Sequence, residues 1–273
     1  MISDAHGYPQ LVRNALDHAA YEAGVDRLVF AGDIVDRGPD PRACLELLEA
    51  SGAEVLWGNH DVAVLIGQAI FPQDALSWTL RPDFIQRFHA DRWRVAACID
   101  SVLVTHAGLS RAYRHDLARC GGDPARLARA LDDEFRETLA PAVAAAGPGA
   151  AGGPPADSDG RDGRRGVPLD AGPLWPLDAR PRLLDDSGPL WFRPSAALPG
   201  ELLTGVTQVC GHTPVDGAER RALAALGLNV VDPSLVLGLT HDLGLTYRYA
   251  VIEDGAVRVE EGTLDDGEAA GAE

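Results

Sequence analysis

The stretch Leu28-Val29-Phe30-Ala31-Gly32-Asp33-Ile34-Val35-Asp36-Arg37-Gly38 joins a short apolar run to a polar loop, and it decides the fold prediction. The apolar run 28–31 is typical of a short buried strand, because Gly32-Asp33 bounds it with a turn signal. Open α/β sheets place their sites at the carboxyl ends of such strands. The stretch therefore predicts a buried strand that delivers two carboxylates and an arginine to one edge of a sheet.

The same arrangement of a strand followed by polar residues recurs along the chain, and apolar positions at helical spacing fill the intervening stretches. This alternation of strands and helices predicts an α/β domain. We expect helices at 10–23 and 41–50, and strands at 54–57, 101–105, 206–210, 226–232 and 246–260.

Composition limits the class of protein. The 273 residues are 46% hydrophobic and 24% charged, which excludes a disordered chain and allows a substantial core. Acidic groups outnumber basic ones by 41 to 24, so the net charge of −17 repels polyanions and we expect no nucleic-acid binding. The longest nearly unbroken apolar run, 62–71, is about half of what spans a bilayer, so we expect no membrane segment. Every basic residue is arginine, which excludes a catalytic lysine.

The four cysteines, at positions 44, 98, 120 and 210, are scattered and form no CxxC pair. A disulfide framework or a thiolate zinc site is therefore not expected, and we predict a cytoplasmic location.

We expect a single domain over residues 1–262, followed by an acidic tail at 263–273. Residues 141–172 would interrupt the domain as a mobile, disordered insertion, because 21 of these 32 residues are Pro, Gly or Ala and the segment cannot bury enough apolar surface. Only three residues precede Asp4, although a typical strand needs about 5. We therefore expect that the recorded start is late and that the true N-terminus lies upstream.

Five short blocks at the expected strand ends carry residues suited to chemistry. Each block alone is more often a turn than a site. Together they offer carboxylates, imidazoles, an amide oxygen and arginine, a mixed set of nitrogen and oxygen donors that suits two Mn²⁺, Fe²⁺ or Zn²⁺ ions better than Mg²⁺. The blocks are Asp4-Ala5-His6-Gly7, Gly32 to Gly38, Gly58-Asn59-His60-Asp61, His106-Ala107-Gly108 and Gly211-His212-Thr213.

Taken jointly, the five blocks resemble the calcineurin-like metallophosphoesterase superfamily. The Gly-Asp-x-x-Asp-Arg-Gly form of 32–38 is similar to its phosphoprotein phosphatase branch and bacterial relatives. The resemblance runs in order from Asp4 to about Asp232, leaving out the expected insertion. It implies a four-layer α-β-β-α sandwich of two mixed sheets, which periodicity alone does not predict.

The resemblance also implies a metal-binding role for several residues. Asp4 and His6 would bind a first ion, and Asp33 would bridge two ions. The second ion would be held by Asn59, His106 and His212. Manganese is the expected metal, with iron or zinc as alternatives.

The remaining matches imply roles toward the substrate. His60 matches the general acid, Asp36 the carboxylate that orients it, and Arg37 a phosphate-holding arginine. Leu190-Trp191-Phe192-Arg193 is similar to a Leu-Trp-x-Arg element by which bacterial relatives add a second arginine, here Arg193. The other histidines lie outside the five blocks, and we expect them to be structural or solvated. They are His18, His89, His115 and His241.

Three blocks depart from the eukaryotic pattern and favour a bacterial-type enzyme. Asp61 stands where many phosphoprotein phosphatases have glutamate, and His106-Ala107-Gly108 differs from the common His-Gly-Gly. Val231-Asp232-Pro233-Ser234 loosely replaces an Ile-Asp-Thr-Gly element.

The leading hypothesis is a binuclear metal-dependent phosphoesterase that hydrolyses phosphomonoesters with a metal-activated hydroxide, with phosphoserine or phosphothreonine in proteins as the expected substrate. The close rival is a hydrolase of dinucleoside polyphosphates or another nucleotide. A rival from another class is a phosphate-binding module without turnover. Substrate selection is expected in loops around the site, including 68–94.

Overall fold

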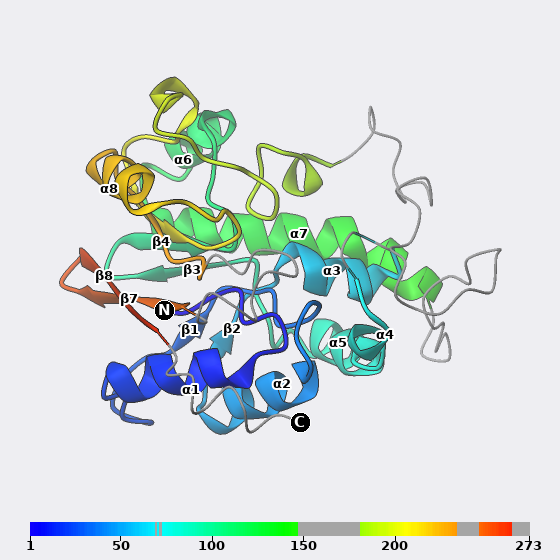
Figure 1. Ribbon diagram of the computed structural model, residues 1–273. Coiled ribbons are helices and arrows are strands. Elements are labelled where there is room, and N and C mark those ends of the chain that lie inside the picture. Colours follow the sequence, from blue (N-terminus) through cyan, green and yellow to red (C-terminus); the bar gives the residue numbers. More distant parts are fainter. Residues whose placement is uncertain (69, 71–72, 147–180, 234–245, 264–273) are drawn as a thin grey trace.

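The structure is a computed structural model that describes residues 1–68, 70, 73–146, 181–233 and 246–263. Two sheet layers lie face to face between two layers of helices (Figure 1), so the expected four-layer α/β sandwich is confirmed. The outer helices are α1 (Pro9–His18) and α2 (Pro41–Ala50) on one side, and α6 (Arg114–Arg119), α7 (Pro124–Ala146) and α8 (Gly217–Ala225) on the other.

The first sheet layer is built around a parallel pair, β1 (Val29–Phe30) and β2 (Glu54–Val55). Ile2 forms a parallel bridge to Phe30 on the free side of β1. Met1 exchanges two hydrogen bonds with Ala250, at 2.7 and 2.8 Å, and so joins the pair to a hairpin. That antiparallel hairpin consists of β7 (Thr246–Glu253) and β8 (Ala256–Thr263).

The second sheet is mixed and has the strand order β3-β4-β5-β6. Its first pair is antiparallel and the other two pairs are parallel. The parallel strands end at the same edge, which is where His106 and His212 follow. The bounds are β3 (Ala96–Ile99), β4 (Val102–Thr105), β5 (Thr207–Cys210) and β6 (Leu228–Val230).

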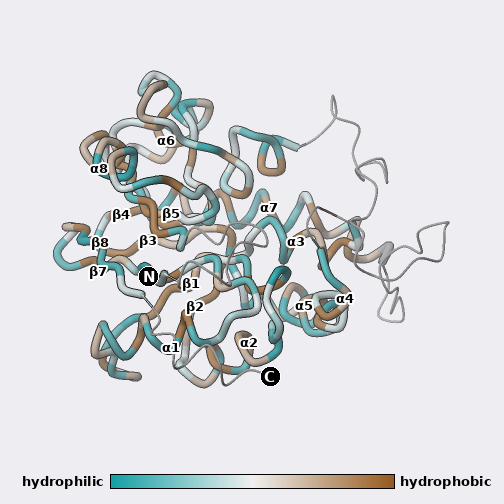
Figure 2. The backbone as a smooth tube through the Cα atoms, viewed as in Figure 1, coloured by the Kyte–Doolittle hydropathy of each residue, from teal (hydrophilic) through white to brown (hydrophobic). Residues whose placement is uncertain are grey.

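The core explains why the run 28–31 contains no polar position. Val29 and Ala31 pack between the two sheets, whereas Leu28 and Phe30 pack against the helices on the other face. A strand buried on both faces is apolar throughout instead of alternating. Figure 2 shows hydrophobic residues along these strands, between the helix layers.

Two predicted helices have different outcomes. The helix at 41–50 is confirmed, and Asp40 caps it by accepting a hydrogen bond from the N–H of Ala43 at 2.9 Å. The helix predicted at 10–23 ends at His18. Ala20 takes a φ of 50°, a left-handed conformation that stops the helix before Gly24.

The predicted insertion begins too early. Residues 141–146 form the last turns of α7, with Pro141 inside the helix and Val143 buried in the core. Helical packing overrides the composition here, so this part of the boundary is wrong. The rest of the expected insertion, His241, Ser234 and the tail beyond Thr263 lie outside the described residues.

The remaining elements of the described residues are three α-helices and three short 3₁₀ helices. No helix in the described ranges is both long enough and apolar enough to cross a membrane. These elements are α3 (Asn59–Ile66), α4 (Ala75–Trp78), α5 (Arg81–His89), η1 (Arg111–Tyr113), η3 (Arg182–Leu184) and η4 (Pro199–Glu201).

Candidate active site

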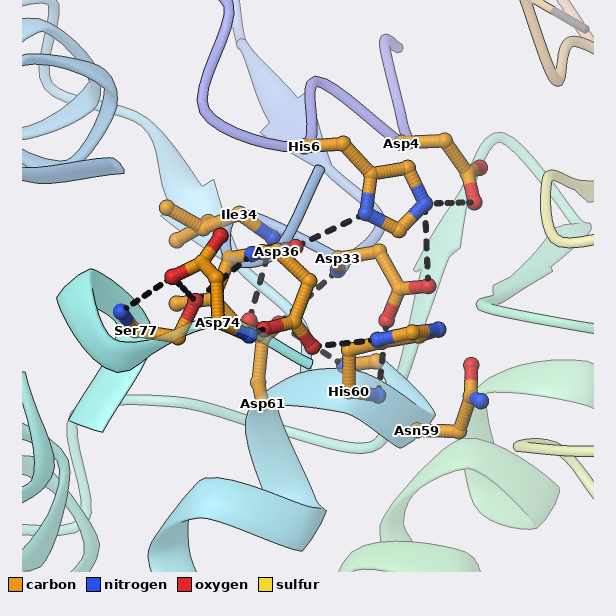
Figure 3. Close-up of polar contacts among 12 residues, drawn as sticks. Asp4, His6, Asp33, Ile34, Asp36, Asn59, His60, Asp61, Asp74 and Ser77 are labelled. Atoms are coloured by element: carbon orange, nitrogen blue, oxygen red, sulfur yellow. Dashed lines mark hydrogen bonds and ion pairs between the residues drawn. The ribbon is translucent and has the colours of Figure 1, made fainter. Parts of the chain in front are cut away.

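The five sequence blocks meet at the carboxyl edge of the two sheets, and Figure 3 shows the part formed by the first three. Each block follows a strand or bridge, so the polar side chains come from loops held by buried strands. The eight side chains of the metal and dyad positions are all buried, namely Asp4, His6, Asp33, Asp36, Asn59, His60, His106 and His212.

The loops hold these residues in an unusual backbone conformation. Positive φ values cost about 1–3 kcal/mol at residues other than glycine and persist only where the surroundings fix them. Such strain gathers at functional sites, and six of the site residues have it. They are Asp4 (53°), His6 (45°), Asp33 (61°), Asp36 (73°), Arg37 (69°) and His212 (65°).

Two motif glycines allow backbone to approach the carboxylates closely. A Cβ atom on Gly58 would lie 2.2 Å from Oδ1 of Asp33, and one on Gly211 would lie 1.9 Å from Oδ2 of Asp4. Both distances are far inside van der Waals contact, so only glycine fits at either position.

The imidazole of His6 is oriented by the backbone. Its Nδ1–H donates to the carbonyl of Val35 at 2.8 Å, so Nε2 carries the lone pair. Nε2 lies 3.5 Å from Oδ2 of Asp33 and 4.0 Å from Oδ1 of Asp4. Burial, and then the charge of Arg37, hold the pKa of His6 well below its ordinary value, so this ring is neutral and available as a ligand.

His106 is oriented in the same way from the second sheet. Its Nδ1–H donates to the carbonyl of Ala31 at 2.7 Å, so its Nε2 is also an acceptor. This Nε2 lies 2.8 Å from Oδ1 of Asn59, 3.2 Å from Nδ1 of His212 and 3.5 Å from Oδ2 of Asp33. Acceptor atoms therefore converge here with too few protons to share between them.

Asp33 lies between these two groups of ligand atoms. Its Oδ2 is 3.5 Å from the Nε2 atoms of both His6 and His106. Its Oδ1 accepts a hydrogen bond from the backbone N–H of His60 at 3.0 Å. Burial raises the pKa of Asp33 well above its ordinary value. A nearby cation offsets such a desolvation penalty and favours the ionised carboxylate.

His212 completes the second group. The backbone N–H of His212 donates to Oδ2 of Asp4 at 2.9 Å. The buried Nε2 of its ring has no hydrogen-bond partner among the described residues. Burial is the main reason that the pKa of His212 lies well below its ordinary value. The other ring nitrogen, Nδ1, lies 3.2 Å from Nε2 of His106 and can serve as a ligand atom for a divalent cation.

In the part of the chain that the structure describes, ligand atoms within 4.8 Å of one another form two groups that share Asp33. One group is Asp33, His106 and His212, and the other is His6, Asp33 and His60. The donors are imidazole nitrogens and carboxylate oxygens, which suit Mn²⁺, Fe²⁺ or Zn²⁺. His60 belongs to the group with His6 and Asp33, where the family resemblance implied Asp4, so its distance from the cluster alone does not separate a ligand from a general acid.

The hydrogen-bond partner of His60 distinguishes its ring from those of His6 and His106. Its Nδ1–H donates to Oδ2 of the buried Asp36 at 2.5 Å, instead of to a backbone carbonyl. Burial alone would lower the pKa of His60, but the carboxylates of Asp33 and Asp36 raise it above the ordinary value. Its ring also lies edge-on to that of His6, with centroids 5.0 Å apart.

The two predicted phosphate-binding arginines are exposed at the site. The charge of Arg37 lowers the pKa values of His6 and His212, and that of Arg193 lowers the pKa of His212. Trp191 lies edge-on to His212 at 5.9 Å between ring centroids. The Leu-Trp-x-Arg element is therefore adjacent to the second group of ligand atoms.

Asp61 is a site residue whose role the sequence did not predict. Its carboxylate accepts backbone N–H groups from Asp33 at 2.8 Å, Ile34 at 3.0 Å and Gly58 at 3.1 Å. It is the third residue of α3, and an acidic residue at that position of an expected helix is a capping signal. Asp74 and Ser77, which contact Asp36, gave no comparable signal.

Comparison with known proteins identifies the family. The family model of the calcineurin-like phosphoesterases matches residues 1–142. The chain belongs to the calcineurin-like phosphoesterase family, and the expected family is confirmed.

The relatives that the chain matches include proteins with two kinds of name. The chain is 32% identical over 120 residues to a symmetrical bis(5'-nucleosyl)-tetraphosphatase of Coxiella burnetii, which covers 40% of this chain and 41% of that protein. It is 35% identical over 69 residues to serine/threonine-protein phosphatase 1 of Salmonella typhimurium, which covers 25% of this chain and 32% of that one. The matches thus span less than half the length of these relatives.

A solved structure supports the fold. The cold-active protein tyrosine phosphatase of a Shewanella species has a TM-score of 0.51 at 16% identity, covering 97% of this chain and 79% of that one. At this identity the likeness concerns the fold alone.

Proposed function

We propose that this protein is a binuclear metal-dependent phosphoesterase that hydrolyses phosphomonoesters. Asp4 and His6 would hold one divalent ion and Asp33 would be shared. Asn59, His106 and His212 would hold the second ion. Two such ions, Mn²⁺ first and iron or zinc as alternatives, lower the pKa of water and stabilise charge on the phosphoryl oxygens when bound.

The single observation that carries this proposal is the position of Asp33. Its Oδ2 lies 3.5 Å from the lone-pair nitrogens of both His6 and His106, which come from different sheet layers. A bridging ligand must offer charge and more than one lone pair, and a buried carboxylate between two imidazole nitrogens does so.

His60 supplies the proton in the proposed reaction. Asp36 holds its Nδ1–H and stabilises the charged imidazolium, so a second proton on Nε2 can be donated to the departing oxygen. The carboxylates of Asp33 and Asp36 raise the pKa of His60, which favours the protonated ring. Arg37 and Arg193 would bind the phosphoryl oxygens through their planar guanidinium groups.

A comparison of leaving groups tests the general acid. A serine alkoxide needs a proton to depart, whereas p-nitrophenolate does not. His60→Asn should lose most of the 10²–10⁴-fold that general acid catalysis supplies, roughly 3–5 kcal/mol, on a phosphoserine peptide and much less on p-nitrophenyl phosphate. Bound metal should stay near the wild-type content. Equal losses on both substrates, or loss of metal, would remove His60 from this role.

Two substrate classes are compatible with the site. Phosphoserine or phosphothreonine in proteins is our first choice because of the Gly-Asp-x-x-Asp-Arg-Gly form of 32–38, and the Salmonella relative carries that kind of name. Dinucleoside polyphosphates are the second choice because the longer matches carry the tetraphosphatase name. A panel of phosphopeptides and diadenosine tetraphosphate, assayed with several metals, separates phosphate release from formation of ADP.

A non-catalytic phosphate-binding module is the alternative from another class. The complete set of ligand atoms and the Asp36–His60 pair argue against it, because a binding module needs no proton donor. Pure protein that holds metal but shows no Mn²⁺-stimulated hydrolysis would favour it.

We also propose a cytoplasmic location, since all four cysteines are free and two of them are buried.

A further inference from the structure

The orienting carboxylate Asp36 is itself held by residues outside the family blocks. Asp36 is fully buried and has a φ of 73°, so its position is strained and needs support from its surroundings. One carboxylate oxygen accepts from His60, and the other accepts the N–H of Asp74 at 3.2 Å. Both oxygens therefore have a partner, one toward the site and one toward α4.

The hydroxyl of Ser77 supports the same residue through the backbone. It accepts the N–H of Asp36 at 2.9 Å and donates its own proton to Oδ1 of Asp74 at 2.9 Å. The direction of both bonds is fixed, because the N–H of Asp36 can only donate, which leaves the hydroxyl proton of Ser77 for the carboxylate of Asp74. Ser77 is fully buried, so no water replaces these bonds at the side chain.

Asp74 closes this arrangement, as Figure 3 shows. Its Oδ1 caps α4 by accepting the N–H of Ser77 at 2.8 Å, while its N–H holds Asp36. A helix of four residues has little stability of its own. The N-cap of α4 and its third residue, Asp74 and Ser77, both bind Asp36, so the position of α4 and that of the Asp36–His60 pair are tied together.

We propose that Ser77 is a positioning residue for the general acid, acting through Asp36 and with Asp74 as its anchor. This inference rests on the proposed function, in which His60 protonates the leaving group. Removing the hydroxyl leaves the N–H of Asp36 without an acceptor in a buried place, so the strained turn relaxes and the Asp36–His60 bond loses its alignment. A merely structural cap would instead affect every substrate equally.

The kinetic test compares two substrates. Phenyl phosphate releases phenolate, a poor leaving group, whereas p-nitrophenyl phosphate releases p-nitrophenolate, a good one. Ser77→Ala should lower kcat/KM about tenfold on the first and less than about threefold on the second. Ser77→Thr, which restores a hydroxyl, should recover most of the loss. The matched control is Thr79→Val, since the hydroxyl of Thr79 donates to Leu76 at 2.6 Å at the other end of α4, without touching Asp36. Equal losses on both phosphates for Ser77→Ala would overturn the inference.

A spectroscopic test separates this inference from the proposed function. In enzyme loaded with diamagnetic Zn²⁺, the Nδ1 proton of His60 should give a downfield resonance that disappears in His60→Asn. Ser77→Ala should shift or broaden this resonance, while Thr79→Val should leave it unchanged. An unchanged resonance in Ser77→Ala would refute the positioning role even if the enzyme is active. If His60→Asn shows no dependence on the leaving group, the general-acid proposal fails, and the resonance still decides the role of Ser77.

Discussion

The carboxylate of Asp61 accepts the backbone N–H of Asp33 across 2.8 Å, so the residue between the two groups of ligand atoms is fixed by a side chain from the next helix. The same carboxylate also accepts the N–H groups of Ile34 and Gly58. One buried anion thus joins the loop after β1 to the start of α3. It holds Asp33 at a φ of 61°, which the loop alone would not favour.

Asp61→Asn should therefore destabilise the protein. An asparagine would turn an NH₂ group toward a backbone N–H, leaving a buried donor unsatisfied at about 1–3 kcal/mol each. We expect the free energy of unfolding in urea to fall by about 2–4 kcal/mol. Asp216→Asn is the matched control, because Asp216 accepts two N–H groups at the exposed start of α8 and should cost less than about 1 kcal/mol. Equal stabilities of the two variants would show that Asp61 does not fix the loop.

Asp33→Asn tests the shared ligand of the proposed function. It removes the charge that two ions would share but keeps an oxygen that can accept the N–H of His60. We expect most of the bound metal to be lost on dialysis and activity to fall more than about 100-fold on every substrate, since even outer partners of metal ligands are worth 10–100-fold. Metal content measured by mass spectrometry checks this. His60→Asn should keep its metal, and a fully loaded Asp33→Asn would contradict the assignment.

The parts of the site that the sequence predicts are those written as contiguous blocks. Asp33 and Asp36 could be found because they directly follow an apolar run, and His106 because it follows another. Their convergence follows from the common edge at which the strands end. The family resemblance, and not periodicity, supplied the four-layer order of the sheets and helices.

The residues that could not be predicted depend on contacts between distant positions. Ser77 is 41 residues from the backbone N–H that it accepts, and no motif in the surrounding sequence marks it. Composition also misled at Pro141, where packing of Val143 against the core continues α7 through a stretch rich in small residues. Tertiary packing thus decided both cases, and a local pattern contains no trace of it.

Gly211→Ala tests the close approach of backbone to the first ligand. A Cβ atom there would lie 1.9 Å from Oδ2 of Asp4 and 2.2 Å from Oγ of Ser3, both on a buried loop. We expect a loss of about 1–3 kcal/mol in the free energy of unfolding, together with weaker Mn²⁺ binding measured by titration calorimetry.

Gly200→Ala is the control for this substitution. Its Cβ atom would meet nothing within 4 Å, so stability should change by less than about 1 kcal/mol and Mn²⁺ affinity should not change. If Gly211→Ala binds Mn²⁺ as tightly as Gly200→Ala, the backbone of Gly211 does not position Asp4.

The last prediction concerns Asp132, a buried carboxyl of α7 far from the metal ligands in the sequence. Its Oδ1 accepts the N–H groups of Val95 at 2.6 Å and Ala96 at 3.3 Å, which hold the start of β3 against the helix. Burial raises the pKa of Asp132 from 3.8 to about 6, although these hydrogen bonds and the charge of Arg94 oppose the shift. The folded protein therefore binds this proton more tightly than the unfolded chain does.

The sign of the pH dependence follows from linkage. The stabilisation by protonated Asp132 is fully present below 3.8 and is lost as the pH rises through about 6. Asp132→Asn is neutral at every pH and keeps an oxygen acceptor, so it lacks this dependence. Between about pH 4.5 and about pH 8, the wild type should lose about 2 kcal/mol relative to the variant, measured as the difference between their urea unfolding free energies. Other groups titrate alike in both proteins and cancel in that difference. Parallel stability curves across this range would show that the carboxyl of Asp132 ionises normally in the folded protein.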